Sequence, residues 1–127
     1  MKLRVAIYAN SSNKGETIEE QIYICRTFAI KQGWQTFDIY ADENWRDVRT
    51  DRPEISFLKV EASARYFDIV LCEHSDRITP NVWELRDFLV SLNKIGLRLW
   101  SVQEGPLDDL RIWLQETLPD LGDTSGP

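Results

Sequence analysis

The 127-residue sequence contains few of the residues that build metal sites and disulfides. It has two cysteines, Cys25 and Cys72, and a single histidine, His74. A zinc site of the usual cysteine and histidine kind cannot be assembled from this set, and no C-x-x-C motif is present. Both cysteines lie in segments with the pattern of a helix or strand core, which favours buried, reduced thiols. We expect neither a metal nor another cofactor.

Long hydrophobic runs and an excess of basic charge are also missing. No apolar stretch is long enough to cross a membrane, and the N-terminal residues lead into a strand pattern rather than a secretory signal. The 15 Lys and Arg residues are outnumbered by 21 Asp and Glu residues, which gives a net charge of −6. Because a free-standing DNA-binding domain usually has a basic face, we expect weak or absent DNA binding by this chain alone. These absences predict a cytoplasmic protein without a membrane partner.

The sequence does contain an alternation of strand and helix patterns. The hydrophobic content of 43% is sufficient for one compact core. Short apolar runs predict strands at residues 3–9, 34–40, 68–72 and 97–102, and amphipathic helices follow each of them, the last at 107–118. This order predicts a three-layer α/β domain over residues 1–119, with a loose tail at 120–127. The expected sheet is mostly parallel, has helices on both faces and follows a flavodoxin-like winding.

Helix-start signals support this assignment. Thr17 and Glu20 have the spacing of a capping box. Pro53 is suited to the first turn of the second helix. Thr79 and Pro80 have the pattern of a cap followed by a first-turn proline, so we expect the third helix to begin there.

Polar residues follow two of the predicted strands, at residues 8–12 and 76–80. In an open α/β sheet, ligands bind at the carboxyl ends of the strands. The sequence therefore predicts a functional site where these two segments meet.

These segments and several others, in this order and spacing, resemble the catalytic domain of serine recombinases, the resolvase and invertase group. The resemblance runs from about residue 3 to about residue 105 and rests on residues 4–9, 17–21, 51–53, 66–71, 75–78, 92–97 and 101–105. It implies a resolvase-like fold and site-specific DNA recombination or integration. In this family a serine attacks a DNA phosphodiester and becomes linked to the 5′ phosphate. Arginines, without a metal, stabilise the anionic transition state.

The resemblance assigns a role to each matching residue. Ser12 takes the place of the nucleophile. Arg52 and Arg77 take the places of two phosphate-binding arginines, and Asp76 and Gln21 take the places of supporting residues. We expect these five to be the catalytic positions, active or vestigial.

Two further arginine positions of the family are not kept. Asn10 and Pro80 occupy them, and Glu73 adds negative charge near the expected phosphate. Loss of one transition-state donor costs about 3–4 kcal/mol, or roughly 10²–10³ in rate. The sequence therefore favours a domain whose cleavage activity is weakened or lost.

Structural roles are the competing interpretation of the same side chains. Ser12 fits a solvated loop, and His74 fits a surface or cap position better than a general base. Arg52 can cap the following helix or pair with Asp51 or Glu54, and Asp76 can form an ion pair with Arg77.

Three functions stay open. The favoured one is a degenerate recombinase domain that acts by protein contact, as a homodimer or with a related recombinase, with Trp45 and Trp113 as candidate contact residues. The second is an active catalytic domain that belongs to a larger DNA-binding protein, with Lys14 or Arg46 replacing the lost charge. The third is a flavodoxin-like small-molecule binder that holds a phosphate at residues 11–17.

Overall fold

The computed structural model describes residues 2–11, 15–43 and 52–107. Its elements are, in chain order, β1 (Arg4–Asn10), α1 (Ile18–Gln32), β2 (Gln35–Asp42), α2 (Pro53–Ser63), β3 (Ile69–Cys72), the 3-10 helix η1 (Ser75–Arg77), α3 (Val82–Lys94), β4 (Arg98–Ser101) and β5 (Gly105–Leu107). Of the helices in these ranges, none could span a lipid bilayer. The helix predicted at 107–118, the tail at 120–127, Ser12, Trp45 and Trp113 lie wholly or almost wholly outside the described residues.

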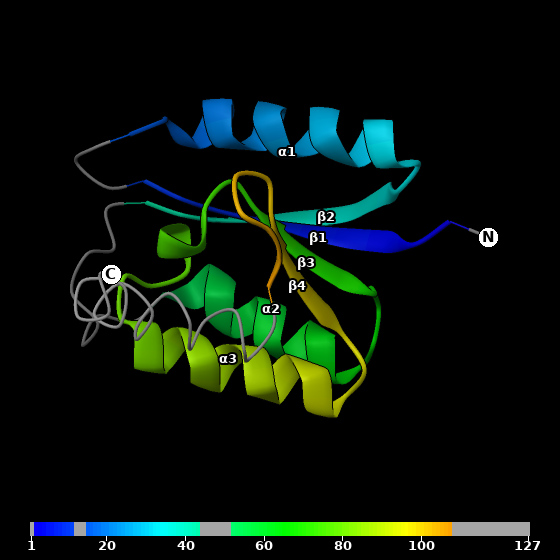
Figure 1. Cartoon of the computed structure of the whole chain (residues 1–127), viewed down its shortest axis with the longest axis vertical. Helices are drawn as coiled ribbons and strands as arrows, with labels where there is room; N and C mark the ends of the chain where they lie inside the picture. The colour runs from blue at the N-terminus through cyan, green and yellow to red at the C-terminus, as the bar shows by residue number, and fades with distance from the viewer. Residues whose placement is uncertain (1, 12–14, 44–51, 108–127) are drawn as a thin grey trace, which may run out of the picture.

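The five strands form one sheet in the order β2-β1-β3-β4-β5. Strand β1 pairs in parallel with β2 and β3, and β3 pairs in parallel with β4. Only β5 runs antiparallel, against β4. Helix α1 covers one face of the sheet and α2 and α3 cover the other (Figure 1). The predicted three-layer α/β fold with a flavodoxin-like winding is confirmed.

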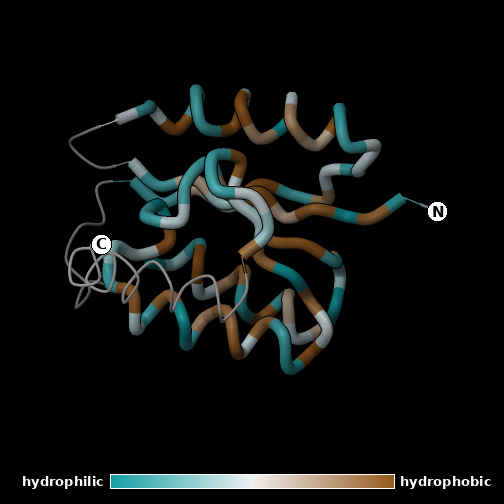
Figure 2. The backbone as a smooth tube through the Cα atoms, viewed as in Figure 1, coloured by the Kyte–Doolittle hydropathy of each residue, from teal (hydrophilic) through white to brown (hydrophobic). Residues whose placement is uncertain are grey.

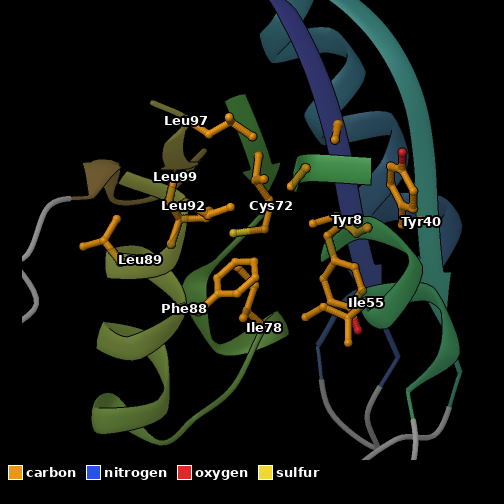
Figure 3. Packing of buried hydrophobic residues seen from close by; sticks show 14 of the residues in the cluster. Tyr8, Tyr40, Ile55, Cys72, Ile78, Phe88, Leu89, Leu92, Leu97 and Leu99 are labelled. Carbon is orange, nitrogen blue, oxygen red and sulfur yellow. The ribbon is translucent and has the colours of Figure 1, made fainter. Parts of the chain in front are cut away.

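The core lies on both faces of the central strands. Residues 5–9 of β1 are fully buried, as expected for a strand covered by helices on both sides. The larger cluster fills the space under α2 and α3, where Tyr8, Ile55, Ile78 and Phe88 converge (Figure 3). A smaller cluster lies under α1. Figure 2 shows hydrophobic residues along the strands between the helix layers.

Helix α3 begins two residues later than the sequence predicted. Asn81 is its N-cap, and Asn81 Oδ1 accepts hydrogen bonds from the backbone N–H groups of Trp83 (2.9 Å) and Glu84 (3.0 Å). Thr79 Oγ1 instead accepts from the backbone N–H of Asn81 at 3.1 Å. Pro80 is therefore not the first helical residue, because the asparagine after it satisfies the free N–H groups of the first turn.

A substitution at this cap distinguishes the two possible helix starts. Asn81→Ala should lower the free energy of unfolding by about 1 kcal/mol, because two backbone N–H groups lose their acceptor. Pro80→Ala should change it much less, since Pro80 is exposed and precedes the cap. Urea denaturation followed by circular dichroism measures both variants. An equal loss for the two would contradict this helix start.

Two other helix starts are confirmed. The capping box of α1 is present, with Thr17 Oγ1 accepting from the backbone N–H of Glu20 at 3.1 Å and the Glu20 carboxylate accepting from that of Thr17 at 2.8 Å. Pro53 is the first residue of α2. Strand β5 was not predicted: Leu107, expected to begin a helix, is a buried strand residue.

Candidate functional site

Buried polar residues gather at the carboxyl ends of β1, β2 and β3. Asn10 is the last residue of β1 and pairs in register with Asp42, the last residue of β2. Glu73 follows β3 directly. The three are exposed to 6% or less. Because polar groups are costly to bury without partners, their hydrogen bonds define how this edge is built.

Arg77 lies at the centre of this edge and is surrounded by carboxylates. Its Nη2 donates to Glu16 Oε1 at 2.7 Å and its Nε donates to Glu73 Oε1 at 3.1 Å. Asp76 Oδ1 is 3.9 Å from the same Nε. The Arg77 side chain is 10% exposed and that of Glu73 is 1% exposed. The ion pair predicted between Asp76 and Arg77 is present, but Glu16 and Glu73 hold the guanidinium more closely.

The protonation states follow from burial and from these contacts. Burial raises the pKa of Glu73, although the contact with Arg77 opposes the shift. The pKa of Glu16 is lowered by its own backbone N–H and then by the hydrogen bond from Arg77. Burial disfavours the charge on Arg77, but the carboxylates of Asp76, Glu16 and Glu73 outweigh it and raise the Arg77 pKa. The guanidinium therefore stays charged, with its charge compensated inside the chain.

Gln21 ties the end of β1 to the segment before α1. It is fully buried; Oε1 accepts from the backbone N–H of Asn10 (3.1 Å), and Nε2 donates to the carbonyl oxygens of Asn10 (3.0 Å) and Glu16 (2.9 Å). Asn10 Nδ2 donates to the backbone carbonyl of Arg77 at 3.3 Å. Both ends of the segment that contains Ser12 are thus attached to the Arg77 region. Ser12 itself lies outside the described residues.

Arg52 lies at the end of β1 nearer to β2. Its Cζ is 5.9 Å from the centroid of the Tyr8 ring, a cation–π distance. Arg52 is the N-cap residue of α2, but its side chain makes no capping hydrogen bond. Within the described ranges Arg52 forms no ion pair with Glu54, contrary to one structural role considered for it, and Asp51 lies outside these ranges.

Sequence analysis missed Asp42, which organises this side of the site. The Asp42 carboxylate accepts from the backbone N–H groups of Glu54 (3.0 Å) and Ile55 (3.1 Å), so it caps α2 from the neighbouring strand. It also accepts from the Tyr8 hydroxyl at 2.8 Å. Burial is the main reason that the pKa of Tyr8 is raised, and the Asp42 hydrogen bond acts in the same direction. An acidic residue at a strand end, ahead of a helix that begins with proline, was the available signal.

The turn after β3 is held by His74 and by Glu104, which lies between β4 and β5. His74 Nδ1 accepts from the backbone N–H of Asp76 at 3.1 Å and caps η1, as predicted. Glu104 accepts from the backbone N–H and the hydroxyl of Ser75 at 2.8 and 2.9 Å. Pro80 is exposed and adds no charge at its position.

The remaining reactive groups do not add to this edge. Cys25 and Cys72 are free and buried, and burial raises the pKa of Cys25 to about 12 and that of Cys72 well above its usual value. A buried thiol with a raised pKa is a poor nucleophile. In the ranges that the structure describes, no group of three or more His, Cys, Asp or Glu residues is placed to hold a metal ion.

Comparison with known proteins decides the family. The sequence model of the family "Resolvase, N terminal domain" matches residues 5–116. The chain belongs to this family. It is a member of the serine recombinase catalytic-domain group, as the sequence resemblance implied. No match was found among curated proteins.

Solved structures of serine recombinases share the fold. The N-terminal catalytic domain of TP901-1 integrase is 25% identical with a TM-score of 0.79, and the match covers 96% of this chain and 95% of that one. A resolvase family site-specific recombinase from Streptococcus pneumoniae is 18% identical with a TM-score of 0.76, covering 98% and 90%. The C-terminal catalytic domain of ISC1926 TnpA, an IS607-like serine recombinase, is 21% identical with a TM-score of 0.70, covering 98% and 84%.

Within this recombinase fold, the predicted site residues divide into two groups around the end of β1. Arg77, Asp76 and Gln21 lie on the side of β3 and α1, where carboxylates compensate the arginine. Arg52 lies on the side of β2, above Tyr8. Their catalytic roles stay a prediction.

Proposed function

We propose that this chain is a serine recombinase catalytic-domain relative whose DNA cleavage is weakened or lost and which acts through protein contact. The observation that carries the proposal is the state of Arg77. Its guanidinium donates to Glu16 and Glu73 and is 10% exposed. A phosphate-binding arginine must offer its donors to the phosphate, and in this chain Nη2 and Nε of Arg77 each donate to a carboxylate instead.

The local charge balance supports the same conclusion. Glu16, Glu73 and Asp76 approach one guanidinium, so the carboxylates outnumber the positive charge that they compensate. The two positions at which the family has further arginines hold Asn10 and Pro80. A phosphodiester that reaches this edge meets net negative charge, which opposes both its binding and the growth of charge in a transition state.

A covalent-adduct assay tests the loss of cleavage. The protein is incubated with a nicked suicide DNA substrate, and attachment of Ser12 to the 5′ phosphate is measured by gel shift and mass spectrometry. We expect adduct formation no higher than that of Ser12→Ala, and lower than that of a competent serine recombinase by roughly 10⁴-fold or more. Robust Ser12 adduct formation would overturn the proposal and favour an active catalytic domain within a larger DNA-binding protein.

The double variant Asn10→Arg with Pro80→Arg sharpens this assay. It returns two guanidinium groups but leaves Arg77 bound to Glu16 and Glu73. Pro80 precedes the Asn81 cap, so the change leaves the start of α3 intact. We expect little gain in adduct formation, and strong restored cleavage would show that the two missing arginines alone account for the loss.

Exposed aromatic side chains support a role in protein contact. Phe37 on the edge strand β2, Phe57 on α2 and Tyr66 after α2 are exposed to 41%, 49% and 48%. The Phe37 and Tyr66 rings are 6.0 Å apart. On α3, Trp83 is 59% exposed, which the sequence did not predict. Aromatic residues are enriched at protein interfaces, so we propose a homodimer or a heterodimer with a related recombinase.

The small-molecule alternative rests on the winding of the sheet and on the phosphate-binding segment considered at residues 11–17. Flavodoxin-like winding occurs in many unrelated proteins, so it is weak support for a ligand.

We also propose that the domain extends to residue 119. The family match to residue 116 is consistent with that boundary.

A further inference from the structure

We propose that the Glu16 carboxylate is an internal ligand that closes a phosphate-class anion site on Arg77. The inference rests on the proposed function, because it takes Arg77 as the family's phosphate-binding arginine. It adds that the site is blocked by a specific, removable side chain rather than destroyed.

The two carboxylates that hold Arg77 differ in how freely they can leave. The Glu73 side chain is 1% exposed and follows β3 directly, so it is a fixed counterion. The Glu16 side chain is 36% exposed and lies before α1. Glu16 binds Nη2, whereas Glu73 binds Nε. Release of Glu16 therefore frees the guanidinium nitrogen on the more exposed side and leaves the inner ion pair in place.

The backbone around Glu16 is held independently of its carboxylate. Its carbonyl oxygen accepts from Gln21 Nε2 at 2.9 Å. The capping box of Thr17 and Glu20 fixes the next turn of chain. At the preceding residue, Gly15 has φ of 88°, and a Cβ there would be 2.5 Å from Arg77 Nη2. Glycine therefore allows the backbone to lie against the guanidinium. Removing the Glu16 charge should leave this backbone position unchanged.

The chemistry of the freed position selects the ligand. A guanidinium N–H that binds a carboxylate oxygen at 2.7 Å can also bind a phosphate oxygen, because both are anionic oxygen acceptors of similar geometry. With Glu16 neutral, Glu73 and Asp76 still approach Arg77, but the site has one negative charge fewer and repels an incoming anion less. Inorganic phosphate and a DNA phosphodiester share this chemistry.

The test is a titration of the full chain at low salt. Amide and arginine side-chain NMR signals are followed while inorganic phosphate, or separately a short DNA duplex, is added to wild type, Glu16→Gln and Glu19→Gln. Glu19 is an exposed acidic residue in the first turn of α1 and serves as the matched control. We expect Glu16→Gln to bind phosphate roughly tenfold more tightly than wild type. Glu19→Gln should bind as wild type does, and the gain should fall as salt rises.

The signals that shift with each ligand show whether the site exists and what it binds. Shifts at Arg77 and residues 15–17 with phosphate alone identify a small-anion site, and the same shifts with the duplex identify a DNA phosphate site; both support the internal ligand. Glu16→Gln binding no tighter than Glu19→Gln, or shifts away from Arg77, would overturn it. Because all three proteins keep Arg77, the titration does not depend on a destabilising change at that residue. A Ser12 adduct formed by wild type would overturn the proposed function without altering this titration.

Discussion

Replacing Arg77 with glutamine should lower the free energy of unfolding by about 3–5 kcal/mol. The substitution leaves the carboxylate of Glu73, 1% exposed, without the guanidinium that compensates it at 3.1 Å. Its other oxygen, Oε2, accepts no hydrogen bond within the described residues. Breaking a buried pair by removing one partner is costly because an uncompensated charge stays buried. Chemical denaturation at neutral pH measures the loss.

Two controls show whether the loss comes from the buried charge. Arg4 pairs with Asp68 at 3.4 Å, but these side chains are 45% and 36% exposed, so Arg4→Gln should cost less than about 1 kcal/mol. In the double variant Glu73→Gln with Arg77→Gln, both charges are absent and most of the loss should be recovered. Arg77→Gln costing no more than Arg4→Gln would contradict the buried pair.

The pH dependence of the Arg77→Gln defect has a definite sign. Burial raises the Glu73 pKa in the folded protein, and Arg77→Gln removes the contact that opposes this rise. A raised carboxyl pKa means that the folded state binds the proton more tightly than the unfolded state does. The loss of unfolding free energy in Arg77→Gln should therefore be largest above the pKa that Glu73 has in the folded variant. It should shrink as the pH falls from that pKa toward the ordinary carboxyl value of about 4.3. Loss of the Glu16 contact acts in the same direction, because the lowered Glu16 pKa stabilises wild type only above that pKa.

Local patterns were sufficient to predict the layers of this fold but not its shortest elements. Residues 5–9 are apolar at every position, which indicated a strand buried on both faces, and they are fully buried. Strand β5 has three residues and contains Pro106, so no periodicity marked it. Its Leu107 fitted a helical stripe equally well. At α3, Thr79 and Pro80 matched a helix start, but Asn81 binds two N–H groups of the first turn and takes the cap.

For the site, the sequence predicted which residues are present but not which residues they contact. Motif spacing identified Arg77 as a retained residue, yet its closest partner, Glu16, is 61 positions away in sequence. Which acceptor an arginine chooses depends on how β1, β3 and the segment before α1 meet in space. The presence of an arginine in the sequence therefore did not establish a free cation.

Asp42→Ala should lower the free energy of unfolding by about 2–4 kcal/mol, and it tests the β2 side of the site. Asp42 is 1% exposed and supplies the only side-chain cap that the described residues give α2, at 3.0 and 3.1 Å. Loss of such a cap costs about 1 kcal/mol. The buried Tyr8 hydroxyl, which donates to Asp42 at 2.8 Å, would also lose its acceptor, at a cost of about 1–3 kcal/mol.

Tyr8→Phe is the matched control, because it removes the hydroxyl and leaves both N–H bonds to Asp42 in place. Its expected cost is about 1 kcal/mol. Hydrogen exchange at Glu54 and Ile55 should be faster in Asp42→Ala and unchanged in Tyr8→Phe, since only the first variant frees these N–H groups. Equal stability losses and equal exchange in the two variants would show that Asp42 acts through Tyr8 alone. The start of α2, and with it the position of Arg52 over the Tyr8 ring, would then have another origin.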